Sequence, residues 1–149
     1  MKNIRLCRLA IFVLVSSFLA VFVIGCNKNQ AFDADKALTR LLSEVRYEAE
    51  LEDVSDLAGF VFGDLPEGVE IKMYMTDGTC TDTVMRFKSS DKAAVRSVLD
   101  EYLASLKKEA DRYNPQELSK LDNALIFEKG DYVFCCVTSD SAAAKRIFD

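Results

Sequence analysis

The sequence contains no histidine at any of its 149 positions. This absence excludes serine or cysteine nucleophiles paired with histidine, histidine general bases and all histidine-ligated metal sites. The chain also lacks any spacing of residues that is typical of a catalytic motif or of a metal site. We therefore assign no catalytic residue, no metal ligand and no cofactor. Chemistry that rests on carboxylates, lysine, tyrosine or a lone cysteine is not excluded.

Cysteine is scarce, and three of the five cysteines lie beyond the N-terminal segment: Cys80, Cys135 and Cys136. Their odd number and irregular spacing specify no disulfide, although Cys80 could pair with either of the other two outside the cytoplasm. Neighbouring residues of a strand point to opposite faces, so that Cys135 and Cys136 are poorly placed to share a metal. We expect the three cysteines to serve as small apolar side chains in or beside a core, with Cys136 facing inward and Cys135 outward.

A long apolar run occurs at the N-terminus, from Leu9 to Ile24, after three basic residues and before Gly25 and Cys26. This order is typical of a bacterial lipoprotein signal peptide over residues 1–25, with Cys26 as the acylated (palmitate-bearing) first residue of the mature protein. The alternative is an uncleaved transmembrane helix, but a run of about 16 residues is slightly short for one. Both interpretations place the remainder on the extracytoplasmic face of the cell membrane, because the basic residues precede the apolar run.

The rest of the chain is acidic. Removing residues 1–25 takes away three of the 19 basic residues and none of the 24 acidic ones, which leaves a net charge near −8. Nucleic-acid phosphates and anionic lipid headgroups repel such a domain, so that we expect no nucleic-acid partner and a membrane attachment through the lipid on Cys26 alone. After a tether over residues 26–32, the remaining length suits one domain over residues 33–149.

Apolar periodicity and turn residues predict the elements of this domain. The pattern predicts a helix that begins at Asp33 or Asp35 and a short helix that ends at Gly63; residues 45–51 between them fit either a short strand, which the alternation favours, or a frayed helix end. It then predicts a strand over 69–75 and its partner over 83–87 after a tight Asp77-Gly78 turn, a long helix from Asp91 to about Tyr113, a helical turn over 116–121, a second hairpin around Lys129-Gly130, and a helix over 141–148. We expect an α+β fold of two layers: a four-stranded, mainly antiparallel sheet in the order ββα-ββα, with helices on one face and preceded by an N-terminal helix.

Four residues are candidate ligand or partner contacts. Tyr74 and Arg86 are predicted on the outward face of the first hairpin, although the same pattern also fits a solvated face with weak salt bridges. Tyr113 and Asn114 lie where Pro115 ends the long helix, which is also what a simple helix stop with a packed ring would show. The leading interpretation is a non-enzymatic binding or interaction module with an envelope protein as its partner. The alternatives are a small carboxylate-dependent enzyme or enzyme accessory acting on cell-envelope material, and a subunit whose sheet edge pairs with a partner strand.

An ordered set of short motifs resembles a known family. The motifs are Gly78-Thr79-Cys80-Thr81-Asp82, Phe87-Lys88, Tyr113-Asn114-Pro115-Gln116-Glu117, Lys120-Leu121 and Gly130-Asp131-Tyr132-Val133-Phe134. Together they resemble a domain-of-unknown-function family of small Gram-positive bacterial lipoproteins, over roughly Asp33–Phe148. In this family an acidic residue tends to follow the hairpin glycine, a place that Asp82 fills. The resemblance implies a lipoprotein and a fold, but no activity and no catalytic residue.

Overall fold

The computed structural model describes residues 32–63 and 65–149. The predicted signal peptide, Cys26 and all but the last residue of the tether lie outside the described residues. Every helix within those two ranges is too short or too polar to cross a membrane.

A five-stranded sheet forms the centre of the domain, and all neighbouring strands are antiparallel. In spatial order the strands are β1 (Glu52–Asp53), β2 (Glu70–Met75), β3 (Thr83–Lys88), β5 (Tyr132–Val137) and β4 (Leu125–Lys129). β3 lies in the middle and pairs over its whole length with both β2 and β5. The prediction of four strands is wrong, because the two residues of β1 pair with the end of β2.

The predicted strand over 45–51 is also wrong. The side chains at its start continue the packing of the preceding helix α2 (Ala34–Glu44): Val45 is buried and the Tyr47 hydroxyl donates a hydrogen bond to the Leu41 carbonyl at 3.0 Å. These contacts hold the segment against the end of α2, so that the alternating apolar residues serve packing and not a β-ladder.

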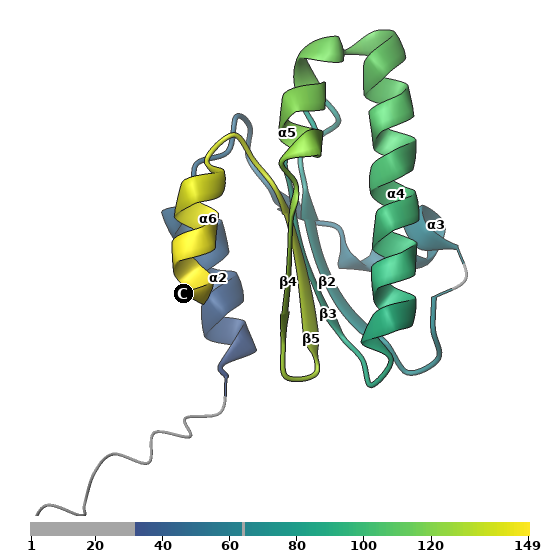
Figure 1. Cartoon of the computed structure of the whole chain (residues 1–149), viewed down its shortest axis with the longest axis vertical. Coiled ribbons are helices and arrows are strands. Elements are labelled where there is room, and N and C mark those ends of the chain that lie inside the picture. The colour runs from purple at the N-terminus through teal and green to yellow at the C-terminus, as the bar shows by residue number, and fades with distance from the viewer. Residues whose placement is uncertain (1–31, 64) are drawn as a thin grey trace, which may run out of the picture. The chain divides into compact units, whose positions relative to one another are not determined.

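Helices cover both faces of the sheet among the described residues, so the predicted two-layer arrangement with helices on one face is wrong (Figure 1). One face carries α2 and α6 (Ser141–Phe148). The other face carries α3 (Ala58–Phe62), α4 (Lys92–Tyr113) and α5 (Leu118–Asp122). Two short 3-10 turns, η2 (Ser55–Leu57) and η3 (Pro115–Glu117), precede α3 and α5. The orders β2-β3-α4 and β4-β5-α6 do occur, but β1 and α3 precede the first of them, and α4 and α6 lie on opposite faces of the sheet.

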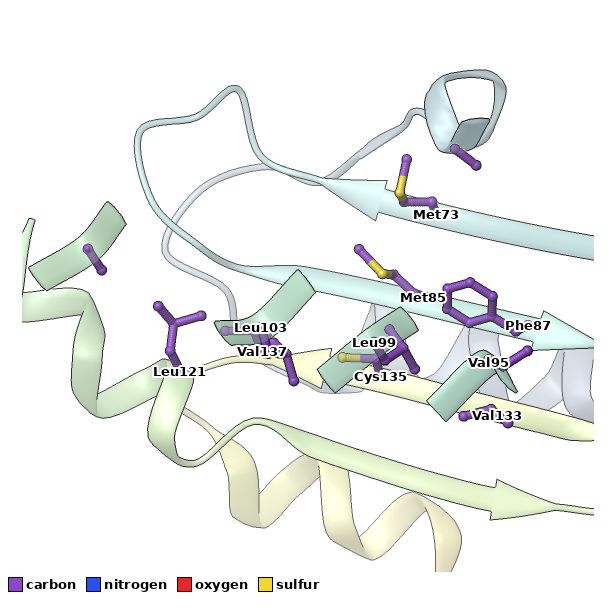
Figure 2. Close-up of a cluster of buried hydrophobic side chains, with 12 residues drawn as sticks. Met73, Met85, Phe87, Val95, Leu99, Leu103, Leu121, Val133, Cys135 and Val137 are labelled. Atoms are coloured by element: carbon purple, nitrogen blue, oxygen red, sulfur yellow. The ribbon is translucent and has the colours of Figure 1, made fainter. Parts of the chain in front are cut away.

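The larger core lies between the sheet and α4. Met73, Met85 and Phe87 of the first hairpin are fully buried there, against Val95 and Leu99 of α4 (Figure 2). These strand residues alternate along the chain and α4 presents residues at helical spacing, which is why the sequence predicted both elements correctly.

The second core lies between the sheet and the α2–α6 pair. Val84, Phe134 and Cys136 point to this side, opposite to Met85 and Cys135. Cys135 is therefore buried beneath α4, and the prediction that it faces outward is wrong because each face of the sheet has its own core. A strand that is apolar on both faces requires cover on both faces.

Three helices begin in the same way, as the sequence predicted. Asp33, Asp91 and Asp140 each accept a hydrogen bond through Oδ1 from the backbone N–H three residues later, at 2.9, 2.9 and 3.2 Å. An aspartate in this position satisfies a backbone donor that the helix itself cannot satisfy and places negative charge at the helix N-terminus.

The two hairpins differ in their turns. The predicted second hairpin is confirmed, with its turn at residues 130–131, one residue later than the predicted Lys129-Gly130, and Gly130 adopts a φ of 57° there. The connection between β2 and β3 instead spans residues 76–82, so that the predicted tight Asp77-Gly78 turn is wrong. There, Asp77 Oδ1 accepts hydrogen bonds from the backbone N–H and the hydroxyl of Thr79, which shapes a wider loop, here called the 76–82 loop.

Candidate functional site

The four predicted contact residues separate into two pairs on opposite faces of the sheet. Tyr113 and Asn114 lie together at the C-terminal end of α4 and both line one cavity. Tyr74 and Arg86 point toward the face that α2 covers. No single site brings all four together.

Arg86 is 9% exposed, because α2 lies over the strand face that the sequence placed in solvent. Its guanidinium pairs with the Asp35 carboxylate and lies 5.6 Å from the centre of the Tyr132 ring. Tyr74 is half-buried and lines a shallow depression with Leu42. The expectation of an exposed sheet face is thus wrong, and a ligand contact by Tyr74 or Arg86 stays a prediction.

The cavity beside Tyr113 and Asn114 has a volume of about 340 Å³. It lies between the 76–82 loop and the C-terminal half of α4, and its lining includes Met75, Cys80 and Thr83 on one side and Tyr102, Leu106 and Tyr113 on the other. The volume falls at the lower end of the range for small-ligand sites, which are mostly apolar with a few polar groups. Tyr113 is 81% exposed and lies at the mouth of the cavity.

Polar groups in this cavity differ in whether they have partners. The Thr76 hydroxyl donates to the Cys80 carbonyl at 2.7 Å, and the Cys80 thiol lies 3.7 Å from the same hydroxyl oxygen. The Tyr102 hydroxyl is buried and makes no hydrogen bond of normal geometry with any described residue, although the Thr83 side chain lies near enough to oppose part of the rise in its pKa. Burial raises the pKa of this phenol, so that it stays protonated and can donate a hydrogen bond. A buried donor without a partner is costly, unless a ligand or water meets it.

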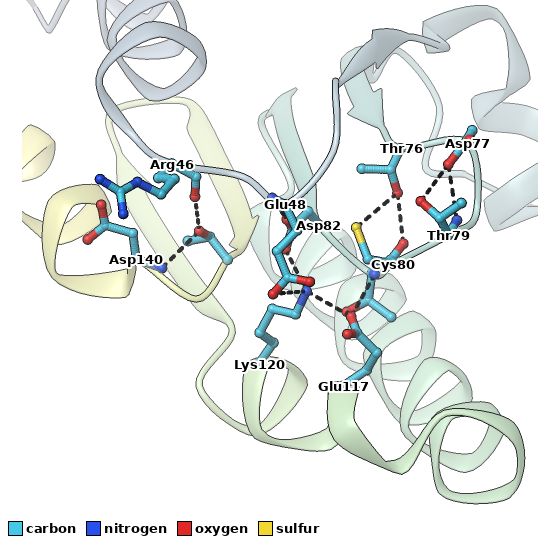
Figure 3. Close-up of polar contacts among 12 residues, drawn as sticks. Arg46, Glu48, Thr76, Asp77, Thr79, Cys80, Asp82, Glu117, Lys120 and Asp140 are labelled. Carbon is cyan, nitrogen blue, oxygen red and sulfur yellow. Dashed lines mark hydrogen bonds and ion pairs between the residues drawn. The ribbon is translucent and has the colours of Figure 1, made fainter.

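A cluster of four charged residues lies next to the same loop (Figure 3). In this lysine cluster, Lys120 Nζ lies 2.9 Å from Glu117 Oε2, 3.0 Å from Asp82 Oδ1 and 3.1 Å from Glu48 Oε1. Asp82, Glu117 and Lys120 are buried, whereas Glu48 is about half exposed. The four residues come from the end of the 76–82 loop, from η3, from α5 and from the segment after α2, so the cluster joins parts of the chain that are distant in sequence.

The carboxylates of the lysine cluster also accept hydrogen bonds from the backbone. Glu117 Oε2 accepts from the backbone N–H and the hydroxyl of Thr81 at 2.9 and 2.7 Å, and Asp82 Oδ2 accepts from the Glu48 N–H at 2.6 Å. Burial alone would raise the pKa of Glu117, but the hydrogen bonds from Lys120 and Thr81 outweigh it and hold this pKa below its ordinary value. Burial likewise disfavours charged Lys120, yet its three carboxylate partners raise its pKa. Glu117 and Lys120 therefore stay charged at neutral pH.

The described residues contain no group of histidine, cysteine, aspartate and glutamate side chains arranged to hold a metal ion. The thiols of Cys80, Cys135 and Cys136 are all free, so neither disulfide that the sequence left open is formed. Burial raises the pKa of Cys135 and Cys136 to about 12, which keeps both thiols protonated and unreactive.

Sequence reasoning did not assign the most distinctive residues of this region to a site, although Asp82, Glu117 and Lys120 belong to the motifs that carry the family resemblance. Tyr102 was assigned only to the buried face of a helix, and nothing local indicates that its hydroxyl would lack a partner. For the lysine cluster a weak signal exists, because Glu117 and Lys120 are three residues apart and share a helical face. Asp82 is 38 positions away from Lys120, and no spacing rule links them.

Residues 69–138 match the model of a protein family described as a domain of unknown function (DUF4358). The match begins just before β2 and ends just after β5, so that it includes α4, the cavity and three members of the lysine cluster, but neither α2 nor α6 nor Glu48. No curated protein and no solved structure matches the chain. The resemblance to a family of unknown function is thus supported over residues 69–138, a shorter range than expected, where the chain is similar to the DUF4358 domain.

Proposed function

We propose that the chain is an extracytoplasmic lipoprotein, anchored in the cell membrane by acylated Cys26, whose domain is a non-enzymatic binding module. The leader with its Val23-Ile24-Gly25-Cys26 sequence supports the anchor, because basic, apolar and small residues precede a cysteine in that order. The acidic remainder of the chain offers no second route to an anionic membrane surface.

The observation that carries the binding role is the cavity between the 76–82 loop and α4. It combines apolar side chains with a buried Tyr102 hydroxyl that has no partner among the described residues. Tyr113 and Asn114, which the sequence singled out, lie in its lining. The apolar lining and the polar side chains of Glu109 and Asn114 favour recognition of a ligand that supplies both an apolar and a polar group.

The alternative of a carboxylate-dependent enzyme acting on envelope material would draw on the lysine cluster, where buried carboxylates gather. Proton transfer is efficient when the pKa of the acid or base lies near the working pH. The lowered pKa of Glu117 and the hydrogen bonds that occupy both oxygens of Asp82 favour a structural role instead. The geometry therefore supports binding better than catalysis.

The anchor is tested by mass spectrometry of the membrane fraction of cells that express the full chain. We expect an N-terminal peptide that begins at a lipid-modified Cys26, and none of residues 1–25. A Cys26→Ala variant is the matched control and is expected to stay uncleaved and unacylated. An intact leader in the unmodified protein would refute the lipoprotein proposal.

The binding role is tested by a photo-crosslinking residue in place of Tyr113, at the mouth of the cavity, in intact cells. The same residue in place of Lys145, which is exposed on α6, serves as the control. We expect a discrete crosslinked species for position 113 alone. Equal crosslinking at both positions, or at neither, would contradict a binding role for the cavity.

A further inference from the structure

The cavity beside Tyr113 has a neighbouring cavity along α4. A second cavity of about 580 Å³ lies between α3 and α4, and the two cavities share Tyr102, Leu106 and Glu109. Val98, Tyr102, Leu106, Glu109 and Tyr113 follow one another at helical spacing and form a stripe along α4. We call the two neighbouring cavities together the α4 groove.

The charged residues that line the α4 groove are both acidic. Glu101 lies in the second cavity and Glu109 in both, and neither makes an ion pair with another described residue. Lys108 and Arg112 lie on the other flank of Glu109, in a separate shallow depression. Other charged residues of α4 do pair, such as Arg96 with Asp100 at 3.2 Å and Lys107 with Asp122 at 3.0 Å. The groove thus combines apolar side chains with two exposed carboxylates that form no ion pair with another described residue.

The separation of the two carboxylates sets the length of a matching ligand. Glu101 and Glu109 are eight residues apart on α4, which corresponds to about 12 Å along the helix axis. An extended peptide advances about 3.3 Å per residue, so that residues i and i+4 lie on one face at a similar separation, with residue i+2 between them. Midway along the groove, Leu106 offers an apolar contact to the side chain of residue i+2.

From this complementarity we propose that the α4 groove binds an extended peptide segment of a partner protein that carries two basic side chains four residues apart and an apolar side chain midway between them. The proposal rests on the proposed binding function and names the chemistry of its partner. An acidic, partly apolar groove disfavours nucleic acids and anionic lipids, because their phosphates would face Glu101 and Glu109.

The test uses the peptide Lys-Ser-Trp-Ser-Lys with blocked termini and the purified full chain in non-ionic detergent. The chain contains no tryptophan, so that the fluorescence of the peptide reports binding without background from the protein. Two control peptides separate the contributions: Ser-Lys-Trp-Lys-Ser has the same composition with its charges two residues apart, and Glu-Ser-Trp-Ser-Glu has the opposite charge. We expect the first peptide to bind most tightly and the acidic peptide not to bind.

Variants of the protein locate the bound peptide. Glu101→Gln and Glu109→Gln are each expected to weaken binding of Lys-Ser-Trp-Ser-Lys about threefold at low salt, since each removes one exposed ion pair. Asp111→Asn removes one charge from the same helix outside the groove and is the matched control. Equal affinity for all three peptides, or equal effects of Glu109→Gln and Asp111→Asn, would overturn the proposal.

The outcomes also distinguish this inference from the proposed function. Absence of peptide binding together with specific crosslinking at position 113 in cells would reject the basic peptide while keeping the binding module. Loss of both results would reject both proposals.

Discussion

The lysine cluster and the α4 groove both include residues of the 76–82 loop, but they differ in whether their polar groups have partners within the protein. In the cluster, Lys120 contacts three carboxylates, and the buried carboxylate oxygens also accept backbone hydrogen bonds. In the groove, the Tyr102 hydroxyl has no partner among the described residues, and Glu101 and Glu109 make no ion pair with them. The buried charges of the cluster thus have internal partners, whereas Glu101 and Glu109 of the groove are exposed and unpaired among the described residues.

This difference indicates two distinct roles for adjacent regions. Thr81 and Asp82 attach the end of the 76–82 loop to η3 and α5 through the lysine cluster. The same loop supplies Thr76 and Cys80 to the wall of the groove. We infer that the cluster attaches the end of the loop to the folded core and so contributes to stability, whereas the exposed side chains that line the groove are free to contact a ligand.

The largest expected effect is on stability, from removing the cation of the cluster. Lys120→Met leaves Asp82 and Glu117 buried without their partner and should lower the free energy of unfolding by about 3 kcal/mol in urea denaturation. Lys107→Met, which breaks the exposed pair with Asp122, should cost less than about 1 kcal/mol. Similar losses in the two variants would show that the cluster is no more important than a surface ion pair.

A smaller effect, which depends on pH, is expected at Glu117. Because the pKa of this carboxyl is lower in the folded state, its carboxylate stabilises the fold above the ordinary value of about 4.3, and that contribution is lost as the pH falls through the folded-state pKa. Glu117→Gln should therefore cost about 2 kcal/mol at pH 7. The difference from the unmodified protein should shrink at pH values below about 4.

The control for this titration is Glu70→Gln, which removes an exposed partner of Lys88. Its effect on the free energy of unfolding should stay within about 0.5 kcal/mol at every pH. A cost of Glu117→Gln that does not change with pH would mean that its charge makes no contribution.

Two tyrosines sharpen the comparison of satisfied and unsatisfied groups. The Tyr47 hydroxyl donates to the Leu41 carbonyl, whereas the Tyr102 hydroxyl has no partner among the described residues. Tyr47→Phe should lower the free energy of unfolding by about 1 kcal/mol, and Tyr102→Phe should leave it unchanged or raise it by up to about 1 kcal/mol. Equal losses in thermal or urea unfolding would show that the Tyr102 hydroxyl is paired in solution.

The parts of the fold that local chemistry determines were predictable from the sequence. The capping aspartates Asp33, Asp91 and Asp140 and the alternation of Met73, Met85 and Phe87 each act over a few residues. That α2 and α6 cover the second face of the sheet could not be predicted from local chemistry. Arg86 and Asp82 resemble solvent-facing residues in the sequence, and only the tertiary contacts with Asp35 and Lys120 make their burial favourable.

The turn between β2 and β3 shows a similar limit. Asp77-Gly78 has the composition of a two-residue turn, but Thr76, Thr79 and Thr81 form side-chain hydrogen bonds that favour a wider loop. In the candidate site, Tyr113 and Asn114 were identified because a proline ends the helix beside them. Tyr102 and Lys120 acquire their roles from residues that are distant in the sequence, and a local pattern could not reveal them.

The division of roles is tested most directly by comparing two identical changes, Glu109→Gln and Glu117→Gln, for both stability and binding of Lys-Ser-Trp-Ser-Lys. We predict that Glu109→Gln weakens binding about threefold and leaves the free energy of unfolding within about 0.5 kcal/mol. Glu117→Gln should lower the free energy of unfolding by about 2 kcal/mol and leave binding unchanged while the protein is folded. The reverse pattern, with Glu109→Gln destabilising the fold and Glu117→Gln abolishing binding in the folded protein, would contradict the account.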